Sequence, residues 1–116
     1  MTDSKRIHTF VCPKPLSIEI HGTRLAITDQ ALVLVESNYP VRYYIPRQDV
    51  NMEQLARSQT QTFCPYKGQA TYYSFGSIDD VAWSYETPNS ERSDITMALC
   101  FANTNWFIWP EGEPEI

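Results

Sequence analysis

The chain has few of the residues on which several common kinds of site are built. Its 116 residues include four glycines, two histidines and three cysteines. No Gly-rich phosphate loop and no Gly-x-Ser-x-Gly turn occurs, which argues against a phosphate-binding loop and a serine hydrolase. The histidines and cysteines form no Cys-x-x-Cys or His-x-x-x-His pair, so we predict no metal site. The sequence does not identify a cofactor, so the cofactor is unknown.

Basic residues and long apolar runs are also scarce. Nine Lys and Arg face fourteen Asp and Glu, a net charge of −5, so we expect neither nucleic acid nor an anionic membrane as a partner. No run approaches the roughly 18 apolar residues of a membrane span, and no signal-peptide stretch follows the first residues. The three cysteines are an odd number and widely spaced, which favours free thiols and a cytoplasmic protein.

Aromatic residues are abundant, at 13% of the chain, and most apolar segments are short and end at turn residues. This pattern predicts a mainly β fold, an antiparallel two-sheet sandwich or open barrel. We expect an N-terminal tail or strap over residues 1–15, a single β-rich domain over residues 16–110 and an acidic C-terminal tail over residues 111–116. The expected strands cover residues 17–21, 24–28, 31–36, 41–45, 60–64, 69–75, 81–86, 95–101 and 106–109.

One short helix is predicted near residues 51–58. Asn51 is a suitable N-cap, and Gln54 three residues later completes a capping box. The clearest hairpin follows it, because Pro65 supplies the fixed φ of a turn and Gly68 the positive φ that closes the loop.

Cations and tyrosines concentrate between residues 41 and 74. Strand alternation puts Arg42 and Tyr44 on one face of residues 41–45, and Arg47 follows just beyond Pro46. With Lys67 and Tyr66 from the hairpin loop, these side chains are candidates for a pocket that binds a carboxylate or phosphate. The alternative pairs the same cations with carboxylates and fixes loops onto the sheet, the candidate carboxylates being Glu36, Asp49, Asp80 and Glu86.

Cys64 and the aromatic residues around Trp83 can each be interpreted as functional or as structural. Cys64 lies beside Lys67, whose positive charge would favour a thiolate, so both are candidate catalytic residues. The alternative for Cys64 is a small buried residue before a turn. Trp83, with Tyr72, Tyr73, Phe75 and Tyr85, is a candidate wall for a planar ligand, although such side chains also simply fill a core.

Five segments carry a resemblance to a known family: Tyr44-Ile45-Pro46-Arg47, Asp49-Val50, Cys64-Pro65-Tyr66-Lys67-Gly68, Tyr72-Tyr73-Ser74 and Ala82-Trp83-Ser84-Tyr85-Glu86. Over roughly residues 18–109 the chain resembles the domain of unknown function 427. The resemblance implies a β-rich domain without an established activity, sometimes labelled nucleotidyltransferase-like. That label needs two carboxylates on one face to hold Mg²⁺, whereas the adjacent Asp79 and Asp80 would point to opposite faces of a strand.

Three functions therefore stay open. The first is a small binding domain whose Arg-, Lys- and Tyr-lined pocket takes a small anionic or planar metabolite. The second is an enzyme that uses Cys64 or Lys67 as its reactive group. The third is a structural or adaptor protein that acts as a homodimer through an exposed strand edge.

Overall fold

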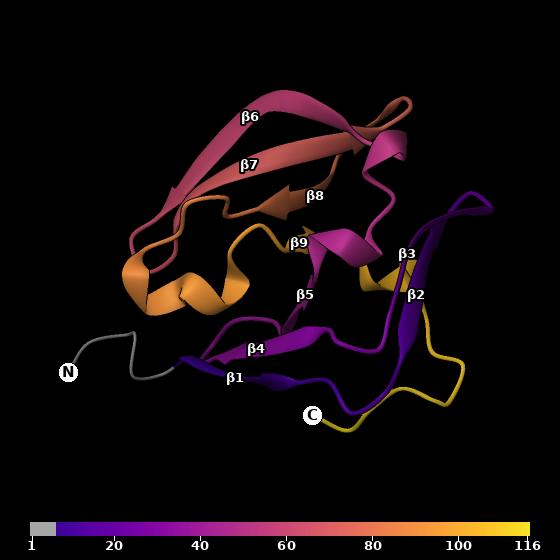
Figure 1. Ribbon diagram of the computed structural model, residues 1–116, viewed down its shortest axis with the longest axis horizontal. Helices are drawn as coiled ribbons and strands as arrows, with labels where there is room; N and C mark the ends of the chain where they lie inside the picture. Colours follow the sequence, from indigo (N-terminus) through magenta and orange to yellow (C-terminus); the bar gives the residue numbers. More distant parts are fainter. Residues whose placement is uncertain (1–6) are drawn as a thin grey trace.

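The computed structural model describes residues 7–116, and two antiparallel sheets dominate it (Figure 1). This confirms the predicted fold class, in its sandwich-like rather than barrel form. The strands are β1 (Ile7–Val11), β2 (Leu16–Ile20), β3 (Thr23–Thr28), β4 (Leu32–Glu36), β5 (Arg42–Ile45), β6 (Ala56–Cys64), β7 (Gly68–Phe75), β8 (Ile78–Ser84), β9 (Leu99–Phe101) and β10 (Phe107–Ile108). The helical segments are the short 3₁₀ turns η2 (Arg47–Asp49), η3 (Met52–Gln54), η4 (Ser90–Ile95) and η5 (Thr104–Trp106).

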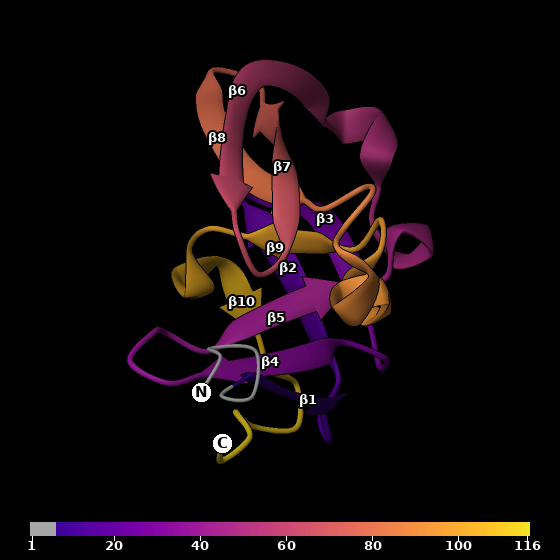
Figure 2. The same cartoon turned by 90° about the vertical axis from the view of Figure 1, so that its left-hand side faces the viewer.

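The larger sheet has seven strands in the order β1-β4-β5-β9-β8-β7-β6, and the smaller has the order β10-β2-β3. The larger sheet curls strongly, so that β6 and β7 arch over one end of the molecule while β1 and β4 lie at the other (Figures 1 and 2). The curl brings the turn after β4 and the loop between β6 and β7 to the same side of the fold. None of the helical segments among residues 7–116 is long and apolar enough to cross a membrane.

Strand alternation sends neighbouring residues of the larger sheet into two separate cores. In β5, Tyr43 and Ile45 pack with β2 and β3 in one buried cluster, whereas Tyr44 belongs to a second cluster on the other face. The predicted division of residues 41–45 between two faces is therefore confirmed. The second cluster forms the floor of the pocket described below.

The predicted hairpin is confirmed. Cys64 pairs with Gly68 across β6 and β7, and the Lys67 N–H donates to the Cys64 carbonyl at 3.2 Å. Gly68 has φ +118°, a conformation that a side chain would strain. A Cβ there would also lie 3.4 Å from the backbone of Pro88 and of Asn89.

The predicted helix near residues 51–58 is wrong. Only η3 is helical there, the Asn51 side chain makes no capping hydrogen bond, and β6 already begins at Ala56. A helix of two turns is marginal by itself, while the extended segment pairs Ala56 with Ser74 and Arg57 with Tyr73 of β7. The strand predicted for residues 95–101 is also shorter than expected, since η4 runs to Ile95 and β9 starts at Leu99.

Both ends of the described chain pack against the fold. Within the segment expected as an N-terminal tail or strap, Ile7–Val11 forms the edge strand β1 and pairs with β4; residues 1–6 of that segment lie outside the described residues. At the C-terminus, Pro114 is buried.

Candidate functional site

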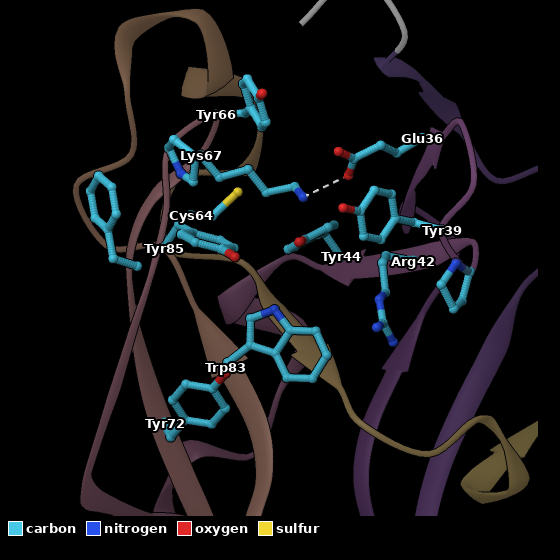
Figure 3. A pocket seen from close by; sticks show the side chains of 13 residues that line it. Glu36, Tyr39, Arg42, Tyr44, Cys64, Tyr66, Lys67, Tyr72, Trp83 and Tyr85 are labelled. Carbon is cyan, nitrogen blue, oxygen red and sulfur yellow. Dashed lines mark hydrogen bonds and ion pairs between the residues drawn. The ribbon is translucent and has the colours of Figure 1, made fainter. Parts of the chain in front are cut away.

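A pocket of about 530 Å³ opens between the two arms of the curled sheet (Figure 3). We call it the Lys67 pocket. Its lining comes from the β4–β5 turn, the start of β5, the β6–β7 loop and one face of β7 and β8: Glu36, Tyr39, Pro40, Arg42, Tyr44, Phe63, Cys64, Pro65, Tyr66, Lys67, Tyr72, Trp83 and Tyr85. The volume falls in the range of small-molecule sites.

An ion pair links the two arms across the pocket. The Lys67 Nζ lies 3.0 Å from the Glu36 carboxylate, and both side chains are only about a tenth exposed. Lys67 comes from the β6–β7 loop and Glu36 from the end of β4, and three strands, β5, β9 and β8, lie between β4 and β7 in the sheet order. One of the predicted ligand cations is thus engaged by a carboxylate that the alternative interpretation named.

Arg42 is the second cation of the pocket. Its guanidinium lies over the Trp83 ring, 5.0 Å from the ring centroid, and none of the ion pairs among residues 7–116 includes it. Stacking on an aromatic face holds the planar group in place while its N–H edge stays available. Among the described residues of the lining, Glu36 carries the one carboxylate, and together with Arg42 and Lys67 it gives these residues a formal charge of +1.

Two buried tyrosines contribute hydroxyl groups. Burial raises the pKa of Tyr44 far above its usual range, and a hydrogen bond with Trp83 offsets only part of that rise. Burial also raises the pKa of Tyr85, with a smaller contribution from Cys64. Both hydroxyls therefore stay protonated near neutral pH and can donate hydrogen bonds.

Cys64 lies at the end of β6, and its sulfur points into the pocket beside the Lys67 side chain (Figure 3). The thiol is partly exposed, whereas the thiols of Cys12 and Cys100 are buried. The structure therefore brings together both candidate catalytic residues and five of the six candidate ligand-binding residues, namely Arg42, Tyr44, Tyr66, Lys67 and Trp83.

Arg47 is the exception, because it lies on the opposite face of the sheet. Its guanidinium is 3.1 Å from Glu86, which also pairs with Arg57 at 3.1 Å, and it donates to Ser84. Tyr73 donates a short hydrogen bond to the same carboxylate. Burial by itself would raise the pKa of Glu86, but Tyr73 and the two guanidiniums together lower it below the usual range. Arg47 therefore belongs to a structural cluster.

The carboxylate of Asp80 is engaged by two hydroxyl groups. Asp80 accepts hydrogen bonds from Ser58 at 2.6 Å and Thr60 at 2.7 Å, which lower its pKa. Within the described part of the chain, no group of three His, Cys, Asp or Glu side chains is placed to hold a metal ion. The geometry gives no support to the two-carboxylate arrangement of a nucleotidyltransferase.

Sequence reasoning missed two aromatic residues of the pocket, Tyr39 and Phe63. Their side chains are 66% and 71% exposed and lie at its rim. Phe63 carries a signal in the sequence, since it is a large apolar residue directly before the distinctive Cys-Pro-Tyr-Lys-Gly loop. Tyr39 carries none, because only the curl of the sheet brings the β4–β5 turn to that loop.

One comparison with known proteins gives a match. The model of a family described as "Domain of unknown function (DUF427)" matches residues 10–111, which confirms the resemblance drawn from the sequence motifs. No curated protein sequence matches the chain.

Proposed function

The chain belongs to the family of domain of unknown function 427, and we propose that the Lys67 pocket binds a small anionic metabolite with a planar part. The proposal rests on the state of the Arg42 guanidinium. Its guanidinium is oriented by Trp83, lines the pocket and makes no ion pair within residues 7–116. A guanidinium in this state is suited to a two-point hydrogen bond with a carboxylate or phosphate.

The charge of the lining favours a ligand with one negative charge. Glu36 already neutralises Lys67, so an incoming monoanion would neutralise what remains on Arg42. A second negative charge would face the Glu36 carboxylate, and that repulsion has a cost in a partly dehydrated pocket. The aromatic rings of Tyr72 and Trp83, whose centroids are 6.0 Å apart, provide the apolar wall for a planar part.

A thermal-shift screen tests the proposal. Carboxylic acids, sugar phosphates and nucleotides would be added to wild type, Arg42→Gln and Arg57→Gln. A ligand at 100 times its Kd adds about 2.7 kcal/mol to the stability, which is a shift of several degrees. We expect a carboxylate to stabilise wild type and Arg57→Gln, whose guanidinium lies on the other face of the sheet, but not Arg42→Gln. Equal stabilisation of all three proteins would contradict the role of Arg42.

Catalysis at Cys64 is a second candidate function, and the position of its thiol inside the pocket supports it (Figure 3). An enzyme of this kind needs a reactive thiolate near neutral pH. The rate of alkylation by iodoacetamide at pH 7 separates the two functions, because a nucleophilic cysteine reacts faster than a free model thiol. A rate at or below that of the model thiol would leave Cys64 as part of the pocket wall.

We also propose a cytoplasmic location for the protein, which the three free cysteines support.

A further inference from the structure

A second cavity lies on the other face of β5. Its volume is about 470 Å³, and we call it the Trp109 cavity. Strand alternation separates the two sites, since Arg42 and Tyr44 line the Lys67 pocket while Val41 and Tyr43 line this one. The segment after β10 returns along its rim and contributes Glu113, Pro114 and Ile116.

Three aromatic rings form a corner of the Trp109 cavity. The Tyr43 ring centroid is 5.5 Å from that of Phe107 and 5.6 Å from that of Trp109, with interplanar angles of 78° and 64°. Phe107 and Trp109 are 6.1 Å apart and inclined by 66°. The three rings therefore pack edge to face against one another and together form one aromatic wall of the cavity. Such corners suit a methylated or free ammonium, which is attracted to aromatic faces.

The charge of the cavity has the matching sign. Among the described residues that line it, Glu113 carries the one charged side chain, and Thr104 and Asn105 add polar groups. Burial raises the pKa of Tyr43 most, and the nearby Glu113 carboxylate adds to that rise. The Glu113 carboxylate thus acts on the aromatic corner electrostatically and would stabilise a cation held there.

We propose that the Trp109 cavity binds a small organic cation with an ammonium or trimethylammonium group. The aromatic corner of Tyr43, Phe107 and Trp109 surrounds the cationic head, and Glu113 supplies the counter-charge. This site lies on the other face of β5 from the Lys67 pocket, with Pro40 lining both cavities, and its ligand has the opposite charge.

A titration of ¹⁵N-labelled full-length protein tests the proposal, with choline as the probe at constant ionic strength. The control ligand is 3,3-dimethyl-1-butanol, which has the shape of choline without its charge. We expect saturable shifts of the Trp109 indole N–H signal with choline, an unmoved Trp83 indole signal, and binding at least fivefold weaker for the neutral compound. Equal affinity for both compounds, or no saturable shift with up to about 50 mM choline, would overturn the proposal.

Two variants separate the contribution of charge from that of folding. Glu113 is exposed, so Glu113→Gln should leave the fold unchanged and weaken choline binding at least threefold, while the affinity for the neutral compound stays the same. Arg42→Gln changes only the Lys67 pocket and should bind choline like wild type. Unchanged choline affinity in Glu113→Gln would refute the role of the carboxylate. Loss of choline binding in Arg42→Gln would show that choline binds in the Lys67 pocket and would overturn the proposal.

Discussion

Removal of the Lys67 charge alone is expected to destabilise the protein by about 3 kcal/mol. In Lys67→Met the apolar stem of the side chain is kept, but the Glu36 carboxylate, about a tenth exposed, loses its counter-charge. Loss of one partner of a buried ion pair costs about 3–5 kcal/mol, and access of water to the pocket favours the lower end. For a domain of this size the expected fall in Tm is roughly 10 °C.

The magnitude follows from two opposing terms. At the observed separation of 3.0 Å and an effective dielectric constant of about 20, the two charges attract each other by about 5–6 kcal/mol. The cost of dehydrating both ions offsets most of this attraction. The double variant Glu36→Gln/Lys67→Met carries neither charge, so it should recover most of the loss and fall within about 1 kcal/mol of wild type.

Urea unfolding at pH 7 of wild type, both single variants and the double variant measures the coupling between the two side chains. Arg57→Met is the matched control, because the Arg57 side chain of the ion pair with Glu86 is 61% exposed, and the pair should contribute less than about 1 kcal/mol. High salt should weaken the control pair more than the buried one. If the double variant lost the sum of the two single losses, the ion pair across the pocket would not exist in solution.

Three further outcomes are expected. Folding lowers the pKa of Glu86, so the ionised Glu86 carboxylate stabilises the folded protein. This contribution is complete above the unfolded pKa of about 4.3 and is lost as the pH falls toward the folded pKa. Glu86→Gln should therefore flatten the dependence of the unfolding free energy on pH between about pH 5 and 3, as measured by urea unfolding. Gly68→Ala should destabilise more than Gly76→Ala in urea unfolding, because the φ of +118° at Gly68 lies outside the left-handed helical region that a side chain tolerates, whereas the φ of +55° at Gly76 lies within it; equal losses would contradict this difference in backbone strain. In native protein, mass spectrometry should find alkylation at Cys64 well before Cys100, whose burial raises its pKa to about 12; alkylation of Cys100 at a similar rate would indicate frequent opening of the core.

Local patterns in the chain were enough for several features of the fold and the site. The alternation of residues 41–45 depends only on the period of two in an extended chain, so it correctly separated Arg42 and Tyr44 from Tyr43. The turn at Pro65 and Gly68 depends on the φ preferences of those two residues, and it placed Lys67 on a loop. Those two local rules assigned each side chain to a strand face or a loop, but they did not bring that face and that loop together.

The same local rules failed where pairing over a distance decided the outcome. The capping signals around Asn51 were present, yet hydrogen bonds to β7 made the segment from Ala56 extended. Arg47 is only five residues beyond Arg42, but η2 after β5 directs it to Glu86 on the far face of the sheet.

By itself, the sequence determined the fold class, the family, the central hairpin and the faces of β5, because each depends on residue type and short-range spacing. Only the tertiary structure decided which side chains share a site. The curl of the seven-stranded sheet brings Glu36 and Tyr39 to the Lys67 loop (Figure 3), and the returning C-terminal segment brings Glu113 to the cavity that Tyr43 lines. Both contacts join residues far apart in the chain, and the geometry of a sheet over many strands is not encoded in any short stretch of residues.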